Sequence, residues 1–209
     1  MLVFVVDDDP AIRNAISWLL RSRQLQSQCF ASAESFVTYL DSAQYKAHLK
    51  LQTPAVLLLD VRMDGMSGLQ LFELLRERGM ISALPVIFLT GHAEVAMAVE
   101  AVKAGAFDFF EKPLADNRLV DRVLQALAHA SAQLAANSTL SDLEKRLRSL
   151  TDREREVMNL IMQGRLNKVI ADELSISMRT VEVHRARIFE KLQVRSAVEM
   201  VNLLSKQIP

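Results

Sequence analysis

The stretch LVFVVDDD (residues 2–9) joins an unbroken apolar run to three consecutive carboxylates. The run Leu2–Val6 is rich in β-branched residues, as is typical of a parallel strand buried on both faces. Similar runs follow at Ala55–Leu59, Pro85–Leu89 and, more aromatic, Phe107–Phe110. Helical patterns lie between them, at Ala11–Arg23, Ser67–Arg78 and Val95–Ala104. Strands that alternate with helices predict a parallel α/β sheet.

The residues that follow these strands carry the chemistry of the N-terminal half, because ligands of a parallel sheet bind at the carboxyl ends of its strands. These ends hold Asp7, Asp8, Asp9, Asp60, Thr90, Glu111 and Lys112. Clustered carboxylates repel one another unless a cation neutralises them, and an all-oxygen cluster suits Mg²⁺. A carboxylate beside Mg²⁺ can attack a phosphoryl group, with Lys112 offsetting the added charge and Thr90 hydrogen-bonding the product.

Each of these residues also has a purely structural interpretation. Asp9 before Pro10 is a good helix N-cap with proline at the first helical position. Asp60 alone could cap a strand end, and Lys112 alone could be a solvated surface lysine. Their joint occurrence after successive strands favours the functional interpretation.

Composition narrows the class of protein. The 209 residues are 50% hydrophobic and 24% charged, which is typical of a soluble globular protein of one or two domains. Cys29 is the single cysteine, which excludes an internal disulfide and a multi-cysteine zinc site and favours a reducing compartment. No apolar stretch approaches the roughly 18–20 residues that span a bilayer, so we expect a cytoplasmic protein with no membrane partner.

The charges balance overall but divide along the chain. Residues 1–137 hold 12 basic and 15 acidic side chains, 12 − 15 = −3, whereas residues 138–209 hold 13 and 10, 13 − 10 = +3. This division fits an acidic N-terminal unit and a basic C-terminal unit with an anionic partner.

A helical pattern begins at Asn117 and is expected to break at residues 137–139, after which Ser141 and Glu144 form the signature of a capping box. Leu140, Leu143, Leu147 and Leu150 follow at three- and four-residue steps. This stripe has two interpretations: it packs on one of the two domains, or it is a coiled-coil seam that pairs two subunits.

Four short helices are expected at the C-terminal end. Thr151 and Glu154 form a second capping box that opens a helix to about Gln163. The others are Asn167–Leu174, Met178–Gln193 and a last helix from Ser196 to about Lys206. The tight turn before Met178 predicts a helix-turn-helix arrangement with Met178–Gln193 as the recognition helix.

The recognition helix would bury Val181, Ile188 and Leu192 and present a short face of mixed charge. That face comprises Arg179, Glu182, Val183, Ala186, Arg187 and Glu190. Arginine can read guanine or phosphate, glutamate can accept from cytosine and valine can touch a thymine methyl. Backbone N–H groups near Thr180 can hold a phosphate, and His184, beside the buried stripe, is expected to pack.

Several separated motifs make residues 1–125 resemble the receiver domain of two-component response regulators, closest to the FixJ type. The motifs are VVDDD (5–9), LLLDVRM (57–63), LTGHA (89–93) and KAGAFDFFEKP (103–113). The resemblance implies a five-stranded doubly wound domain in which Asp60 accepts a phosphoryl group from a sensor histidine kinase. It also implies Mg²⁺ held by Asp8 and Asp60, by Asp7 through water and by the backbone carbonyl of Arg62, with Thr90, Phe109 and Lys112 as switch residues.

Three features depart from that family pattern. Asp64 stands where the loop after the phosphoacceptor usually has proline, which adds a negative charge near the metal and frees a backbone torsion. The chain is longer than usual around Tyr45–Thr53, which predicts an elongated helix or loop and a candidate partner surface. Phe109 has no hydroxyl, so it can act only by burial.

The C-terminal residues 145–205 resemble the LuxR-type helix-turn-helix through LTDREREV (150–157), Gly164, NKVIA (167–171) and TVEVHRARI (180–188). By this resemblance Lys168 and Arg185 contact phosphates, and Arg179, Glu182, Val183 and Arg187 lie nearer the bases. The chain is thus interpreted as a receiver domain (1–125), a helical linker (126–148) and a DNA-binding domain (149–209).

Together these features predict a phosphorylation-dependent transcriptional regulator, not an enzyme, that dimerises on phosphorylation and binds promoter DNA, with RNA polymerase as a further candidate partner. Two alternatives remain open. In the first, the receiver is a phosphorylation-independent dimerisation module. In the second, the protein is an Mg²⁺-dependent phosphohydrolase, although such an enzyme commonly has a carboxylate two residues after its nucleophile, and here that residue is Arg62.

Overall fold

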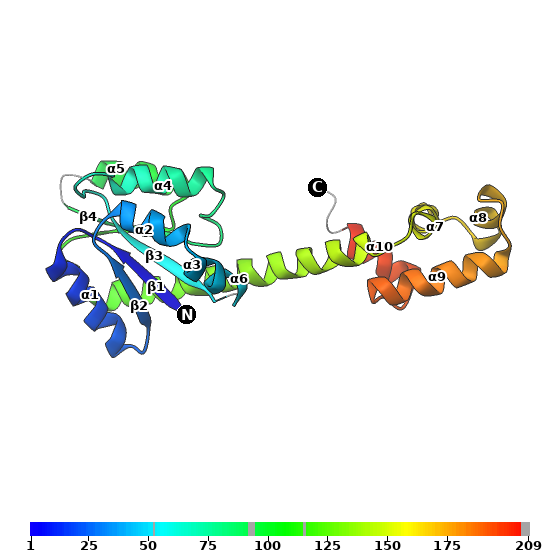
Figure 1. Cartoon of the computed structure of the whole chain (residues 1–209), viewed down its shortest axis with the longest axis horizontal. Coiled ribbons are helices and arrows are strands. Elements are labelled where there is room, and N and C mark those ends of the chain that lie inside the picture. The colour runs from blue at the N-terminus through cyan, green and yellow to red at the C-terminus, as the bar shows by residue number, and fades with distance from the viewer. Residues whose placement is uncertain (52, 92–94, 115, 206–209) are drawn as a thin grey trace. The chain divides into compact units, whose positions relative to one another are not determined.

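The computed structural model describes residues 1–205 except 52, 92–94 and 115 (Figure 1). The chain divides into two compact units, Met1–Ala136 and Asn137–Pro209. The first is a parallel sheet flanked by helices, and the second is helical in its described residues. The predicted fold class, a doubly wound five-stranded sheet followed by an all-α unit, is confirmed.

All five strands of the sheet run parallel in the order β2-β1-β3-β4-β5. Their bounds are β1 Leu2–Val6, β2 Gln26–Phe30, β3 Ala55–Asp60, β4 Val86–Thr90 and β5 Asp108–Glu111. β1, β3 and β4 are buried almost throughout, as their continuous apolar sequences predict, because helices cover both faces of the sheet.

The helices of the first unit form one layer on each face of the sheet (Figure 1). Side chains of α1 (Pro10–Ser22) and the start of α6 (Asp116–Arg148) share one core with alternate strand residues such as Val5 and Leu58. The strand residues that alternate with these, such as Phe4 and Leu57, form the other core with the remaining helices. These helices are α2 (Ala33–Leu40), α3 (Ala43–Lys50), α4 (Gly68–Glu77) and α5 (Val95–Lys103).

Two elements of the first unit, β2 and α3, are not among those that the apolar runs of the sequence mark. The polar strand β2 lies at an edge of the sheet and has no continuous apolar run. The long segment around Tyr45–Thr53 does contain additional helix, as predicted: α3 is a separate helix after α2, and Tyr45 buries its ring against Phe4 and Tyr39. Residue 52 lies outside the described residues.

The expected break at residues 137–139 is wrong, because α6 continues through them to Arg148. Ser141 therefore lies inside a helix and caps nothing. The break was inferred from Asn137, Ser138 and Thr139, which are poor helix formers, but their propensities differ from that of alanine by well under 1 kcal/mol each. Strong helix-forming sequence on both sides outweighs that cost.

The second unit contains α7 (Asp152–Met162), α8 (Asn167–Glu173), α9 (Met178–Leu192) and α10 (Ala197–Ser205), which confirms the four predicted helices. The predicted capping box of Thr151 and Glu154 is present, and Ser177 caps α9. Leu143, Leu147 and Leu150 of the leucine stripe pack on the core of this unit, whereas Leu140 is 44% exposed. For those three leucines, packing on a domain is confirmed.

No helix in the described part of the chain is long and apolar enough to cross a membrane.

Gly68 offers a test of the packing around the end of β3. A Cβ at this position would lie 1.9 Å from the backbone oxygen of Asp60, so Gly68→Ala must displace backbone. We expect Gly68→Ala to lower the free energy of unfolding by about 2–3 kcal/mol. Urea unfolding followed by the fluorescence of Trp18, the single tryptophan, reports on the first unit.

Gly79→Ala is the matched control, because no heavy atom lies within 4 Å of its added Cβ and only its left-handed φ of +67° opposes the change. Its expected cost is about 1 kcal/mol. Equal costs for the two variants would contradict the close approach of Gly68 to Asp60.

Candidate functional site

The predicted site residues of the first unit meet at one edge of the sheet. Asp7 follows β1, Asp60 ends β3, Thr90 ends β4, and Lys112 follows β5. Asp7 and Thr90 are fully buried and Asp60 is 6% exposed. Because neighbouring parallel strands end side by side, a sheet of this order brings residues more than 100 positions apart into contact.

Lys112 joins the two buried carboxylates. Its Nζ donates to Asp7 Oδ2 at 2.8 Å and to Asp60 Oδ1 at 2.5 Å. Its backbone N–H donates to the carbonyl of Thr90 at 2.8 Å, which fixes the strand end that carries the ammonium. One cation thus stands between two anions, and the local charge remains negative.

The electrostatics of Asp60 reflect this excess of negative charge. The pKa of Asp60 is raised to about 6, with burial as the largest cause; Lys112 lowers this pKa, and the charges of Asp7 and Asp8 add to the increase. For Lys112, burial disfavours the charged form, but the hydrogen bonds to Asp60 and Asp7 outweigh it and raise the pKa. The carboxylates therefore lack full compensation, and an added cation would stabilise them.

The loop after β3 is held by backbone hydrogen bonds to two carboxylates. Asp64 N–H donates to Asp8 Oδ2 at 3.3 Å, a bond that proline at this position could not make. Met66 N–H donates to Glu34 Oε1 at 2.7 Å, and the positive φ of Gly65 between them turns the loop. These bonds fix the path of the chain that leaves Asp60.

Sequence reasoning did not find Glu34, or Arg13, whose Nη1 donates to the Asp7 carbonyl at 2.6 Å. No spacing links either residue to its partner, so only the folded chain could reveal them. For Asp9 the structural interpretation is correct, because its Oδ1 accepts from Ala11 N–H at 2.7 Å and caps α1.

The other predicted residues of this site lie near its border. The side chain of Arg62 is exposed on the loop after β3. Phe109 is half-buried on β5, where it pairs with Phe88 of β4. Two residues of the LTGHA motif, His92 and Ala93, lie outside the described residues.

The donor set fits a hard divalent cation in its chemistry, since Asp7, Asp8 and Asp60 offer only oxygen, and the first two raise the pKa of Asp60. In the described part of the chain, however, no three such side chains already converge on one point. Lys112 occupies Asp7 and Asp60, and Asp64 occupies Asp8. Each of these bonds uses one oxygen of its carboxylate, so the second oxygens of Asp8 and Asp60 remain for a cation.

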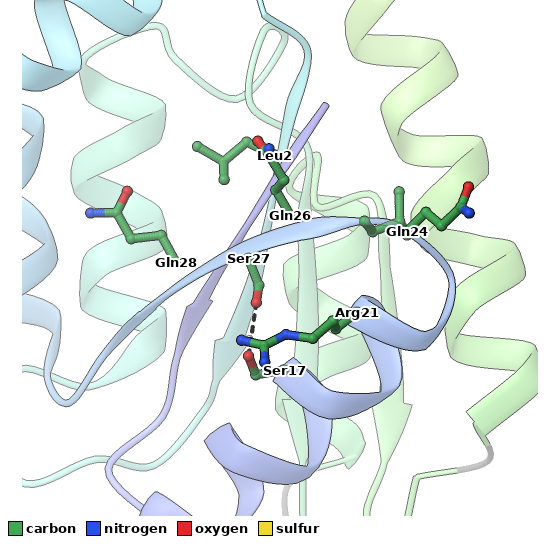
Figure 2. A pocket seen from close by; sticks show the side chains of 8 residues that line it. Leu2, Ser17, Arg21, Gln24, Gln26, Ser27 and Gln28 are labelled. Atoms are coloured by element: carbon green, nitrogen blue, oxygen red, sulfur yellow. Dashed lines mark hydrogen bonds between the residues drawn. The ribbon is translucent and has the colours of Figure 1, made fainter.

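A hollow of about 560 Å³ lies away from the acidic edge, at the other ends of the strands (Figure 2). Leu2 and Gln26 stand at its wall, and Ser17 of α1 bonds Ser27 of β2 across 3.0 Å. Its lining contains Arg21 but no carboxylate. It thus shares none of the chemistry of the acidic edge.

In the second unit, α9 presents the predicted exposed face. Val181, Ile188 and Leu192 are buried, as their spacing predicts. Arg179, Glu182, Val183 and Arg187 are all exposed. Arg179 Nη1 and Glu182 Oε2 are 3.3 Å apart, an exposed pair that contributes little stability and leaves both groups available.

Three other predicted residues differ in their surroundings. Lys168 on α8 is exposed, whereas Arg185 is half-buried and stacks its guanidinium 5.4 Å from the Phe189 ring centroid. The hydroxyl of Thr180 lies 2.8 Å from that of Ser177 at the start of α9. His184 is half-buried, as expected for a packing residue, and its buried Nδ1 has no hydrogen-bond partner in the described structure.

Comparisons with known proteins agree with this architecture. Residues 3–124 match the family described as response regulator receiver domain, and residues 148–204 match bacterial regulatory proteins of the luxR family. The solved low-resolution structure of the response regulator StyR has a TM-score of 0.84 and 38% sequence identity, and 98% of each chain is covered.

Two relatives align over almost the whole chain. The C4-dicarboxylate transport transcriptional regulatory protein DctR of Rhodobacter capsulatus is 42% identical, covering 96% of this chain and 98% of its own. The transcriptional regulatory protein FixJ of Rhizobium meliloti is 37% identical, covering 96% and 93%. This chain therefore belongs to the two-component response regulators of the NarL/FixJ type, DNA-binding proteins whose receiver domain makes the regulation of transcription depend on phosphorylation.

Proposed function

We propose that Asp60 is the residue that accepts the phosphoryl group. The observation that carries the proposal is the Lys112 ammonium shared between Asp60 and Asp7 at the ends of two neighbouring strands. A carboxylate oxygen of Asp60 attacks phosphorus, the bond from phosphorus to the kinase histidine nitrogen breaks, and an acyl phosphate forms. Lys112 lies where it can offset the charge that arrives.

We also propose Mg²⁺ as the cofactor, as receiver domains generally bind it at the phosphorylation site. Asp8 and Asp60 would hold the ion directly, with Asp7 acting through water and the backbone carbonyl of Arg62 completing the set. When bound, the ion supplies positive charge that draws in the phosphoryl oxygens. The uncompensated carboxylates around Asp60 support this proposal.

Thr90 and Phe109 are proposed as the residues that report phosphorylation to the surface. Thr90 ends β4, the strand beside Asp60, so its hydroxyl can turn toward a phosphoryl oxygen. Phe109 is half-buried and can move into the space that Thr90 vacates. The shifted equilibrium would favour a homodimer of the receiver.

The proposed DNA contacts are those of α8 and α9. Lys168 and Arg185 would contact phosphates, the N–H groups near Thr180 would add to them, and Arg179, Glu182, Val183 and Arg187 would lie nearer the bases. Dimerisation raises affinity because the second half-site contact becomes intramolecular. The proposed partners are a sensor histidine kinase, promoter DNA and RNA polymerase, which together imply the cytoplasm.

The two alternative functions are not favoured. A phosphohydrolase belongs to an enzyme class, whereas this family consists of transcription regulators. A receiver that acts only as a dimerisation module does not require the cluster of carboxylates that Lys112 bridges. Asp64, the departure from the family pattern in the loop after β3, makes its backbone bond to Asp8 without blocking Asp60.

Phosphorylation of Asp60 can be tested on the purified full chain. With Mg²⁺ and acetyl phosphate, we expect the intact mass of the full chain to increase by one phosphoryl group, and the fraction of dimer in gel filtration to increase with it. Asp60→Asn should show neither change, because an amide oxygen is a poor nucleophile. Asp64→Asn is the matched control and should retain both. A phosphoryl group on Asp60→Asn would exclude Asp60 as the acceptor.

Metal binding should depend on pH. Because the pKa of Asp60 is raised to about 6, its carboxyl is mostly protonated at pH 5 and ionised at pH 7.5. Protons then compete with Mg²⁺, so the affinity measured by calorimetry should increase as pH rises from 5 to 7 and level off above that. Affinity that is constant over this range would show that Asp60 does not bind the ion.

Substitutions on α8 and α9 can separate phosphate contacts from base contacts. Lys168→Ala should weaken binding to all DNA sequences and reduce the slope of log K against log salt by about 1. Arg179→Ala should instead reduce the preference for the operator over random DNA. Arg195 is exposed and lies outside α8 and α9, so Arg195→Ala is the control that removes one positive charge without removing a proposed DNA contact. Equal losses in all three variants would contradict these assignments.

A further inference from the structure

The first unit has an apolar pocket away from the acidic edge. It encloses about 370 Å³, within the range of small-molecule sites. Its wall is built from α3 with its flanking residues, the chain between α4 and β4, and Leu134 of α6. The residues that line it are Leu40, Asp41, Tyr45, Lys46, His48, Thr53, Ala55, Arg78, Gly79, Met80, Ala83, Leu84 and Leu134.

The additional length of chain before β3 creates this pocket. α3, with Tyr45, Lys46 and His48, supplies one side of it, and Figure 1 shows α3 next to α6. The Tyr45 ring is 5% exposed and stacks on His48 with centroids 6.1 Å apart and planes at 22°. The rings of Tyr45 and His48 thus extend the aromatic cluster around Phe4.

The Tyr45 hydroxyl is the first sign of a ligand. It makes no hydrogen bond in the part of the chain that the structure describes, yet it is not among the polar atoms sealed from solvent. Since the side chain is 95% buried and lines the pocket, the hydroxyl meets solvent there. Burial raises the pKa of Tyr45 to about 12, so the group stays a hydrogen-bond donor.

The charged side chains that line the pocket are the second indication of a ligand. The ammonium of Lys46 has no partner among the described side chains, and Arg78 is paired with Asp41, which is itself 63% exposed. The cations of the lining thus outnumber its single carboxylate. Burial lowers the pKa of His48, which keeps that ring neutral near pH 7, so the inner wall is uncharged.

We propose that this pocket binds a small aromatic carboxylate. The ring of the ligand would pack between the Tyr45–His48 wall and the aliphatic side chains of Met80, Leu84 and Leu134. Its carboxylate would accept from the Tyr45 hydroxyl and face Lys46. The site is independent of Asp60, so ligand binding and phosphoryl transfer can be measured separately.

Calorimetric titration of the full chain with 2-naphthoate tests this proposal, with 2-naphthamide as the uncharged analogue. We expect one saturable site for the acid and binding at least tenfold weaker for the amide. Tyr45→Phe, which keeps the ring and removes the hydroxyl, should weaken naphthoate binding about tenfold. Tyr39→Phe removes a hydroxyl from the same aromatic cluster outside the pocket and should bind like the unchanged protein.

Ala83→Trp fills the pocket and should abolish naphthoate binding; if it unfolds the first unit, Ala83→Leu replaces it. Asp60→Asn should bind naphthoate normally, whatever it does to phosphorylation. Absence of saturable binding at millimolar naphthoate would overturn the proposal. Binding that is unchanged in both Tyr45→Phe and the Ala83 variant, or equal for acid and amide, would overturn it as well.

Discussion

The structure of the first unit depends on two buried carboxylates that share one partly exposed ammonium. Asp7 and Asp60 end neighbouring strands with almost no exposure, and Lys112 reaches both. Such a group is stable only when the geometry is good, because removing one partner leaves an unpaired charge in a medium of low polarity. The parallel order of β1, β3, β4 and β5 supplies that geometry, so the topology and the chemistry have the same origin.

The sequence predicted this edge well because its signals are local. Each carboxylate follows an apolar run, and an apolar run that is buried on both faces needs no periodicity to be recognised. The recognition helix was equally clear, since Val181, Ile188 and Leu192 share a face whatever surrounds them. Where the position of a residue in the fold follows from its neighbours in the chain, the structure confirms that position.

Features that depend on distant partners could not be predicted. Glu34 binds the backbone of Met66, and Arg13 binds that of Asp7, without any repeat that would relate them. The apolar runs did not reveal β2, because an edge strand can be polar. They also did not reveal that α6 continues through residues 137–139, where weak helix formers inside a long helix cost little. The pocket at Tyr45 likewise needed three segments from separate parts of the chain.

The backbone bond from Asp64 to Asp8 has a thermodynamic consequence. With an imino acid at position 64 this bond could not form, and the Asp8 carboxyl would rotate more freely. Here Oδ2 of Asp8 accepts the Asp64 N–H, while the other oxygen of the carboxyl remains for a cation. We therefore expect the bond to hold the Asp8 carboxyl in one orientation, so that less rotational entropy is lost when a cation binds.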